Sequence, residues 1–200
     1  MIVDDGSDIA KSIVSEFGDD RITASAVAHG GPCAARNAGL DIAAGEIITY
    51  LDDDNTLDPG WLHAVSWAFA NNPESAVLYG ARVIDDWDRV SSLGTTGWPR
   101  VQFSPFHRAS LELRNNTDMG VMAHRAGLPA ARFDESLWEC GDWDFLLSLT
   151  EDCVPLELPA IAVYYRTDGQ DRLSGVHADD VQRVREKWAS RRAKRTAQGR

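Results

Sequence analysis

The chain has 200 residues, of which 44% are hydrophobic and 26% are charged, as in an ordinary globular protein with one large domain or one domain and a small appendage. Its formal net charge of −11 excludes nucleic-acid binding through a strongly positive overall field. No apolar run approaches the ~20 residues of a bilayer-spanning helix, and no secretory signal opens the chain, so we expect a cytoplasmic location.

The charge is unevenly distributed along the chain. Residues 178–200 carry eight Lys or Arg against three Asp or Glu, a local balance of +5, whereas the remainder stands at −16. We expect a charged C-terminal helix or tail here. Such a segment is more often a solvated helix end, and the alternative is contact with an acidic membrane surface or a partner. The cysteines Cys33, Cys140 and Cys153 show no CxxC spacing and are expected to be reduced thiols.

The first part of the chain alternates between strand-like and helix-like patterns. Expected strands are at 1–3, 22–28, 46–51 and 76–84, and expected helices at 8–18, 32–44 and 58–71. Pro32 and Pro59 suit first helical turns, and Gly45 suits a helix end. This alternation predicts an α/β fold with a mostly parallel, doubly wound sheet flanked by helices.

The second part of the chain is less regular. Residues 85–118 contain several Gly and Pro and are expected to form a long functional loop. An acidic cluster at 134–144 then leads into a helix. Strand-like residues from 154 to 165 are interrupted by Pro159, which predicts an edge strand or a kink.

The most informative stretch runs from Glu46 to Asn55, where β-prone residues lead directly into Asp52, Asp53 and Asp54. Acids at the carboxyl end of a strand lie where open α/β sheets bind ligands. Three adjacent carboxylates repel one another, and a divalent cation that bridges to phosphate would compensate them. The alternative is helix capping, because Asp58 and a proline follow closely.

Four motifs together resemble those of family 2 glycosyltransferases, which are inverting enzymes with a GT-A (Rossmann-like) fold. They are DDGS at 4–7, GGPCAARNAGL at 30–40, DDD at 52–54 and GDWD at 141–144. Their order and spacing cover roughly residues 1–166. The resemblance implies a GT-A domain over 1–177, with a nucleotide-binding half at 1–84 and an acceptor half at 85–177, followed by the charged helix or tail at 178–200.

The resemblance also implies how a nucleotide-sugar donor, expected to be a UDP-sugar, would be bound. Asp5, together with Asp4, would accept hydrogen bonds from the nucleotide base, since a carboxylate accepts well from a pyrimidine N–H. Arg36 would approach the diphosphate, or alternatively form an ion pair that braces its helix against the acidic residues.

The three consecutive aspartates would hold the rest of the donor. Asp54 would coordinate Mg²⁺ or Mn²⁺ on the diphosphate. Asp52 would share this metal or, like Asp53, hold the ribose or the sugar.

On the acceptor side, the resemblance assigns Asp142 as the general base. A carboxylate at a helix start is favoured in its ionised form by ~0.3–1 kcal/mol, and the alternative role is helix capping. Asp118 is expected to line the acceptor pocket. His107, His124 and His177 are expected to be surface or structural residues. Trp138 and Trp143 could stack on sugar rings or belong to the core.

Three departures from the family pattern matter. Asp168 sits where many members carry a polar loop that includes His. Gly141 stands where the family usually has Glu, which removes one carboxylate from the acceptor side. Family members also normally begin with a strand and a helix before the DDGS strand, whereas this sequence begins at Met1 inside that strand. The exposed sheet edge expected from an N-terminally truncated fold could pair with another chain to form a homo-oligomer. Sugar-nucleotide binding is then expected to be weaker than in a longer relative.

The resulting hypothesis is a metal-dependent inverting glycosyltransferase with a carbohydrate or other hydroxyl acceptor. The alternative is a catalytically weak or inactive GT-A-like module that binds sugar nucleotides or oligomerises. A nucleotidyltransferase would share the layout, but its usual glycine- and lysine-rich opening loop is not seen.

Overall fold

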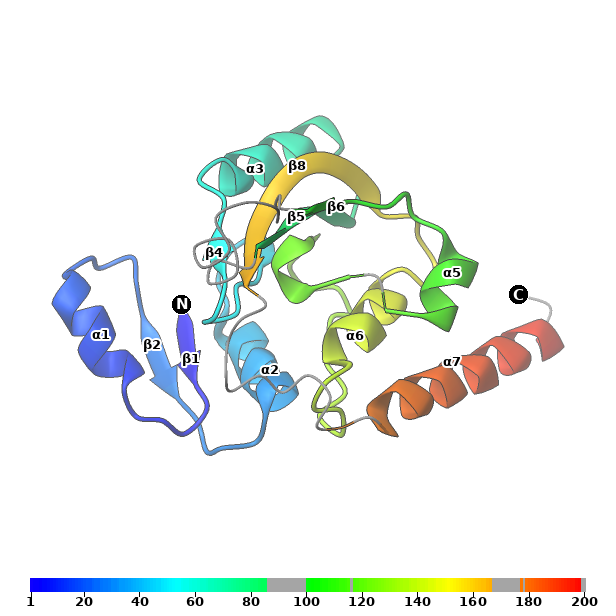
Figure 1. Ribbon diagram of the computed structural model, residues 1–200, viewed down its shortest axis with the longest axis horizontal. Helices are drawn as coiled ribbons and strands as arrows, with labels where there is room; N and C mark the ends of the chain where they lie inside the picture. Colours follow the sequence, from blue (N-terminus) through cyan, green and yellow to red (C-terminus); the bar gives the residue numbers. More distant parts are fainter. Residues whose placement is uncertain (86–99, 116, 167–176, 178, 199–200) are drawn as a thin grey trace, which may run out of the picture. The chain divides into compact units, whose positions relative to one another are not determined.

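The computed structural model describes residues 1–85, 100–115, 117–166, 177 and 179–198 (Figure 1). These residues form two compact units. The first contains residues 1–45, 129–146 and 173–200, and the second contains residues 46–128 and 147–172, with the undescribed positions excepted.

The first unit contains a small parallel sheet. Strand β1 (Ile2–Asp4) pairs with β2 (Ala24–Ala26), with Val3 opposite Ser25. Helix α1 (Ala10–Phe17) connects the two strands and ends at Gly18, whose φ of 60° is a left-handed conformation that glycine adopts without strain.

Among the described residues, two further helices lie entirely within this unit, and the first part of α6 (Gly141–Leu149) also belongs to it. Helix α2 (Pro32–Ile42) begins at Pro32, as the sequence predicts, and lies against β1, because a Cβ on Gly39 would be 3.2 Å from Val3. Helix α7 (Asp179–Ala197) is the long C-terminal helix (Figure 1).

Among the described residues, the second unit contains a six-stranded sheet in the order β3–β7–β5–β8–β4, with β6 paired to β5. The strands are β3 (Ile47–Thr49), β4 (Thr56–Leu57), β5 (Val77–Asp85), β6 (Arg100–Gln102), β7 (Met122–Arg125) and β8 (Leu156–Arg166). Of the strand pairs described in this sheet, β5 and β8 are parallel and the others are antiparallel. The α/β class is confirmed, and the sheet is mixed instead of mostly parallel.

Pro159 lies at an irregularity in β8. Opposite it, β8 advances from Glu157 to Ile161 while β5 advances only from Tyr79 to Ala81. Proline cannot donate a hydrogen bond to the ladder, so it is accommodated at this bulge. The expected kink is therefore present, although 156–166 forms one continuous, curved strand instead of two (Figure 1).

The remaining elements among the described residues are helical. They are α3 (Trp61–Asn71), α5 (Arg108–Leu113), the short 3₁₀ helix η1 (Met119–Val121) and α6 (Gly141–Leu149). The predicted loop at 85–118 is thus partly ordered as β6 and α5, and its residues 86–99 lie outside the described part. No helix among the described residues is long and apolar enough to cross a membrane.

Candidate functional site

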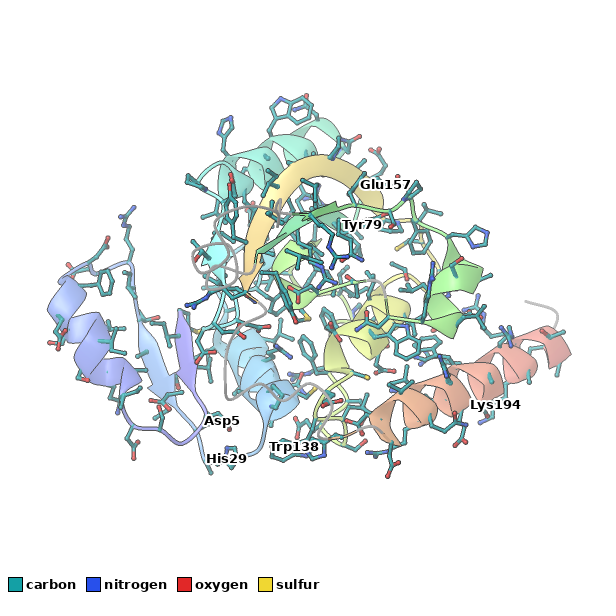
Figure 2. All side chains as sticks on the ribbon, in the orientation of Figure 1. Asp5, His29, Tyr79, Trp138, Glu157 and Lys194 are labelled. Carbon is teal, nitrogen blue, oxygen red and sulfur yellow. The ribbon has the colours of Figure 1, made fainter. Side chains whose placement is uncertain are left out.

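Asp5 is anchored by two backbone amides from the glycine turn before α2. Its Oδ1 accepts from the N–H of Gly30 at 2.8 Å, and its Oδ2 accepts from the N–H of Gly31 at 3.0 Å. His29 Nδ1 lies 3.0 Å from the same Oδ2 (Figure 2). These three contacts fix the orientation of the carboxylate. A carboxylate has about four lone-pair positions, so acceptor capacity remains for a ligand N–H.

Asp4 has a different environment. Its Oδ1 accepts from both the backbone N–H and the hydroxyl of Ser7 at 2.7 Å, and its Oδ2 accepts from the N–H of Ala10 at 3.0 Å. The hydrogen bonds from Ala10 and Ser7 lower the pKa of Asp4 to about 2. The carboxylate is buried and stabilises the turn that leads into α1. Of the two predicted base-binding acids, Asp5 is the more accessible.

Arg36 and Asn37 attach α2 to the segment that carries the second acidic cluster. Asn37 exchanges two hydrogen bonds with the backbone of Phe133: its Oδ1 accepts at 2.9 Å and its Nδ2 donates at 3.0 Å. The Arg36 guanidinium lies over the Phe133 ring, 5.7 Å from the centroid. The Phe133 ring stacks on Phe145 at 4.0 Å. Asn37 is therefore a structural residue of the motif, and its partner Phe133, 96 residues away, carries no signal in the sequence pattern.

Asp142 lies in the first turn of α6, at the helix start where the sequence places it; its role as a general base stays a prediction. Its Oδ1 accepts from the N–H of Trp143 at 2.7 Å, so the carboxylate also takes part in the helix start. The preceding Gly141 has no room for a side chain, because a Cβ there would overlap Sγ of Cys33. Burial raises the pKa of Cys33 to about 12, so its thiol is neutral and acts as a packing group.

One face of α7 is bound to the acidic cluster. Asp180 accepts from the N–H of Trp138 at 2.7 Å and from the N–H of Glu139 at 3.0 Å. Two turns further along α7, Lys187 donates to both Asp134 and Asp144 at 2.8 Å. The expectation of a solvated helix end describes only the last turns of α7.

Trp138 is packed on more than one side. A Cβ on Gly31, whose φ is 89°, would lie 3.2 Å from the ring, so only glycine allows this approach. His177 stacks on the indole at 5.5 Å, and His29 approaches it edge-on at 5.7 Å. Figure 2 shows Asp5, His29 and Trp138 close together. Trp143 is only 1% exposed, so it belongs to the core and cannot stack on a sugar.

In the second unit, the three consecutive aspartates lie on a tight turn between β3 and β4. The N–H of Asn55 donates to the carbonyl oxygen of Asp52 at 3.1 Å and closes the turn. Asp53 and Asp54 occupy its two central positions and are exposed, whereas Asp52 is half-buried. The carboxylates are thus displayed together at one end of the sheet.

Residues at the end of β3 hold this turn in place. Thr49 donates its hydroxyl to the carbonyl of Met122 at 3.0 Å and accepts from Trp61 Nε1 at 3.2 Å. Tyr50 OH lies 2.7 Å from His124 Nε2. Burial lowers the pKa of His124, so the ring is neutral and its role is structural, as expected.

Asp118 is also buried. Its Oδ1 accepts from the N–H of Gly120 at 2.9 Å, and its Oδ2 lies 3.4 Å from Arg82 Nη1. Arg82 in turn donates to Gln102 at 3.0 Å and lies over the Tyr165 ring at 4.8 Å. These contacts give Asp118 a structural role in this unit; its expected place in an acceptor pocket stays a prediction.

The acidic turn fits a divalent cation in its chemistry. Carboxylate oxygens are the ligands that Mg²⁺ and Mn²⁺ prefer, and such ions are often held by one or two carboxylates plus substrate phosphate oxygens. In the described part of the chain, no group of three His, Cys, Asp or Glu side chains is arranged to hold a metal. Asp52 and Asp54 could therefore supply only part of a coordination shell that the donor's diphosphate would complete.

Comparison with known sequences identifies the family. The model of "Glycosyl transferase family 2" matches residues 1–141. A glucosyl-dolichyl phosphate glucuronosyltransferase of Haloferax volcanii is 28% identical over 89 residues, which are 44% of this chain and 28% of that protein. An uncharacterized glycosyltransferase of Nostoc sp. is 29% identical over 105 residues, which are 50% of this chain and 33% of that protein. The chain thus matches about a third of the length of these relatives.

Solved structures show the same fold. S. aureus TarS 1–349 in complex with UDP-GlcNAc has a TM-score of 0.66 and 19% identity, and the match covers 91% of this chain and 54% of TarS 1–349. The complex of the same protein with UDP has a TM-score of 0.61 and 19% identity, and the match covers 91% of this chain and 53% of TarS 1–349. The fold is therefore GT-A. Because the family model matches well over half of its residues, this chain belongs to glycosyl transferase family 2.

Proposed function

We propose that the chain is an inverting, metal-dependent glycosyltransferase that moves a sugar from a nucleotide-sugar donor to a hydroxyl acceptor. The observation that carries the proposal is the family match over residues 1–141. It contains the donor-side motifs around Asp5, Arg36 and the aspartates at 52–54.

The nucleotide of the donor would be recognised through Asp5. Its carboxylate is held in place by Gly30 and Gly31 and retains acceptor capacity for the N–H of a pyrimidine base. The complexes of TarS with UDP-GlcNAc and UDP support a UDP-sugar as the donor. Asp4 would act indirectly, by shaping the turn, and Arg36 would contribute positive charge towards the diphosphate.

Asp54 and Asp52 would hold Mg²⁺ or Mn²⁺, while Asp53 would contact the ribose or the sugar. The bound cation would stabilise the negative charge that the diphosphate gains as it leaves.

The reaction would be a single displacement at the anomeric carbon. Asp142 takes the proton of the acceptor hydroxyl while the acceptor oxygen forms its bond to that carbon. The bond between the anomeric carbon and the diphosphate oxygen breaks on the opposite face, and the nucleoside diphosphate carries away the electron pair. The configuration is inverted. The start of α6 suits this role, because the dipole of a helix favours an ionised carboxylate in its first turn.

A screen of nucleotide sugars with MnCl₂ tests the proposal, with release of nucleoside diphosphate as the readout. We expect turnover with at least one UDP-sugar. Asp142→Asn should reduce kcat by about 10²- to 10⁴-fold, as loss of a general base does. Asp179→Asn is the matched control, because Asp179 is an exposed acid in the first turn of α7.

Two outcomes separate the enzyme from the alternative function. UDP binding without turnover for any donor would favour a sugar-nucleotide-binding module. Equal activity of Asp142→Asn and the wild-type protein would remove Asp142 from the mechanism.

The name of one relative and the basic end of α7 support a lipid-linked acceptor. The Haloferax volcanii relative is named for glucosyl-dolichyl phosphate. After Glu186, α7 carries only basic charges, and each could add about 1 kcal/mol of attraction near an anionic membrane. Sedimentation with phosphatidylglycerol vesicles tests this, since Arg192→Glu/Lys194→Glu should reduce vesicle binding and neutral vesicles should bind neither protein.

A homo-oligomer stays a prediction. In the described part of the chain β1 pairs only with β2, which leaves one edge of β1 open to a second chain. Light scattering during size-exclusion chromatography measures the oligomeric state.

A further inference from the structure

Asn55, the residue directly after the three aspartates, has a side chain that is only half satisfied. Its Oδ1 accepts from the backbone N–H of Arg166 at 3.1 Å. Its Nδ2 is buried and makes no hydrogen bond within the described part of the chain. The assignment of the two atoms follows from Arg166, because a backbone N–H is a donor and must face the amide oxygen. The NH₂ group is thereby directed away from Arg166.

A buried donor without a partner is unfavourable, and natural structures contain few of them. The neighbouring acids explain why a donor is useful at this position. Ionised carboxylates at 52–54 can only accept hydrogen bonds, and the phosphate oxygens of a nucleotide sugar are also acceptors. The Asn55 amide supplies an N–H beside this turn and adds no charge to it.

We propose that Asn55 is a donor-binding residue whose Nδ2 donates a hydrogen bond to an oxygen of the nucleotide sugar. This inference rests on the proposed function and adds a binding group that the sequence motifs do not contain. The oxygen belongs to the diphosphate or to a sugar hydroxyl, and both are hydrogen-bond acceptors of the same kind. The contact with Arg166 holds the Asn55 amide in one orientation, with its NH₂ group unbonded within the described part of the chain.

Calorimetric titration of UDP and of UDP-GlcNAc, each with MnCl₂, tests the inference. Asn55→Asp keeps the acceptor for Arg166 and loses the donor, whereas Asn55→Ala loses both. Each should bind about tenfold to a hundredfold more weakly than the wild-type protein, the range for hydrogen bonds to charged groups. Thr56→Asp is the charge control, because it adds the same charge at an exposed neighbour and leaves the amide intact. It should bind clearly more tightly than Asn55→Asp.

The two ligands distinguish the two sources of oxygen. Equal weakening for UDP and UDP-GlcNAc assigns the contact to the diphosphate, and weakening for UDP-GlcNAc alone assigns it to the sugar. Wild-type affinity of Asn55→Asp and Asn55→Ala for both ligands would overturn the inference. Loss of cooperative thermal unfolding in both variants would also overturn it, because Asn55 would then be a structural residue. If the wild-type protein binds neither ligand, the proposed function fails first and the inference fails with it.

Discussion

The Nζ atom of Lys187 lies 2.8 Å from Oδ2 of Asp144, a carboxylate that is only 1% exposed. The other oxygen of Asp144 accepts from Trp188 Nε1 at 2.8 Å. Burial acts to lower the pKa of Lys187, but its contacts with Asp134 and Asp144 outweigh burial and raise the pKa above the usual value. Lys187 therefore stays charged and attaches α7 to the start of α6. Its partner there, Asp144, lies two residues after Asp142.

Lys187→Met should destabilise the protein because it leaves the Asp144 carboxylate buried without its ammonium partner. Removing one member of a fully buried pair costs about 3–5 kcal/mol. Lys187 is 35% exposed, and Trp188 still donates to Asp144, so we expect a smaller loss of about 2–3 kcal/mol. Urea unfolding followed by circular dichroism measures it.

Lys194→Met is the control for this change, since Lys194 is exposed on the same helix (Figure 2). Its free energy of unfolding should remain within about 0.5 kcal/mol of the wild-type value. Similar losses in both variants would mean that helix propensity or net charge, and not the contact with Asp144, sets the stability.

The acid sensitivity of the fold should depend on Asp134. Burial acts to raise the pKa of this carboxyl, but hydrogen bonds from Lys187 and Ser136 outweigh it and lower the pKa from 3.8 to about 2. A lowered folded-state pKa contributes stability that is fully present above pH 3.8 and is lost as the pH falls towards 2. In this pH range, the free energy of unfolding of Asp134→Asn should therefore fall less steeply than that of the wild-type protein. Parallel curves for the two proteins would contradict the prediction.

The sequence predicts structure well where the interacting residues are close together in the chain, and poorly where they are far apart. The expected helices at 8–18, 32–44 and 58–71 correspond to α1, α2 and α3, because each combines apolar spacing with a local start signal. The strands β4, β6 and β7 have only two to four residues, so the sequence shows little periodicity there and no indication of an antiparallel partner. The mixed sheet follows from these strands.

The contacts of α7 also join residues that are far apart in sequence, and the sequence does not predict them. The charges of this helix indicate a solvated segment, and the partner of Lys187 lies 43 residues away in sequence. A signal did exist: Val181, Val184 and Trp188 are spaced as one apolar helix face, and the latter two are buried. For the candidate site, the motifs predict which residues bind the donor and the acceptor, and this stays a prediction, whereas the glycine amides that hold Asp5 could be located only in three dimensions.

The glycine at position 141 and Cys33 should be energetically coupled. Alanine in place of glycine in a helix normally stabilises by about 0.4–1 kcal/mol, but here the added Cβ would overlap Sγ of the buried Cys33. We therefore expect Gly141→Ala to destabilise by about 1–3 kcal/mol, as overpacking does. The Glu that the family usually carries at this position should be tolerated even less.

A double-mutant cycle with Cys33→Ala separates this overlap from other effects. The double variant should be more stable than the sum of the single changes predicts, by about 1 kcal/mol or more, because the smaller side chain makes room for the new Cβ. Additive effects in urea unfolding would show that Cys33 does not restrict position 141.

The protein should be more stable with valine, the apolar isostere of threonine, at position 117. The residue is 8% exposed, and its Oγ1 is buried and without a hydrogen-bond partner among the described residues. Thr117→Val replaces this unpaired hydroxyl by a methyl group and should raise the free energy of unfolding by about 0.5–1 kcal/mol, instead of lowering it as most buried substitutions do. Thr117→Ser, which keeps the hydroxyl and leaves a small void, should lower it by about 1 kcal/mol. If urea unfolding gives the opposite order, the hydroxyl forms a hydrogen bond in solution, and the prediction is wrong.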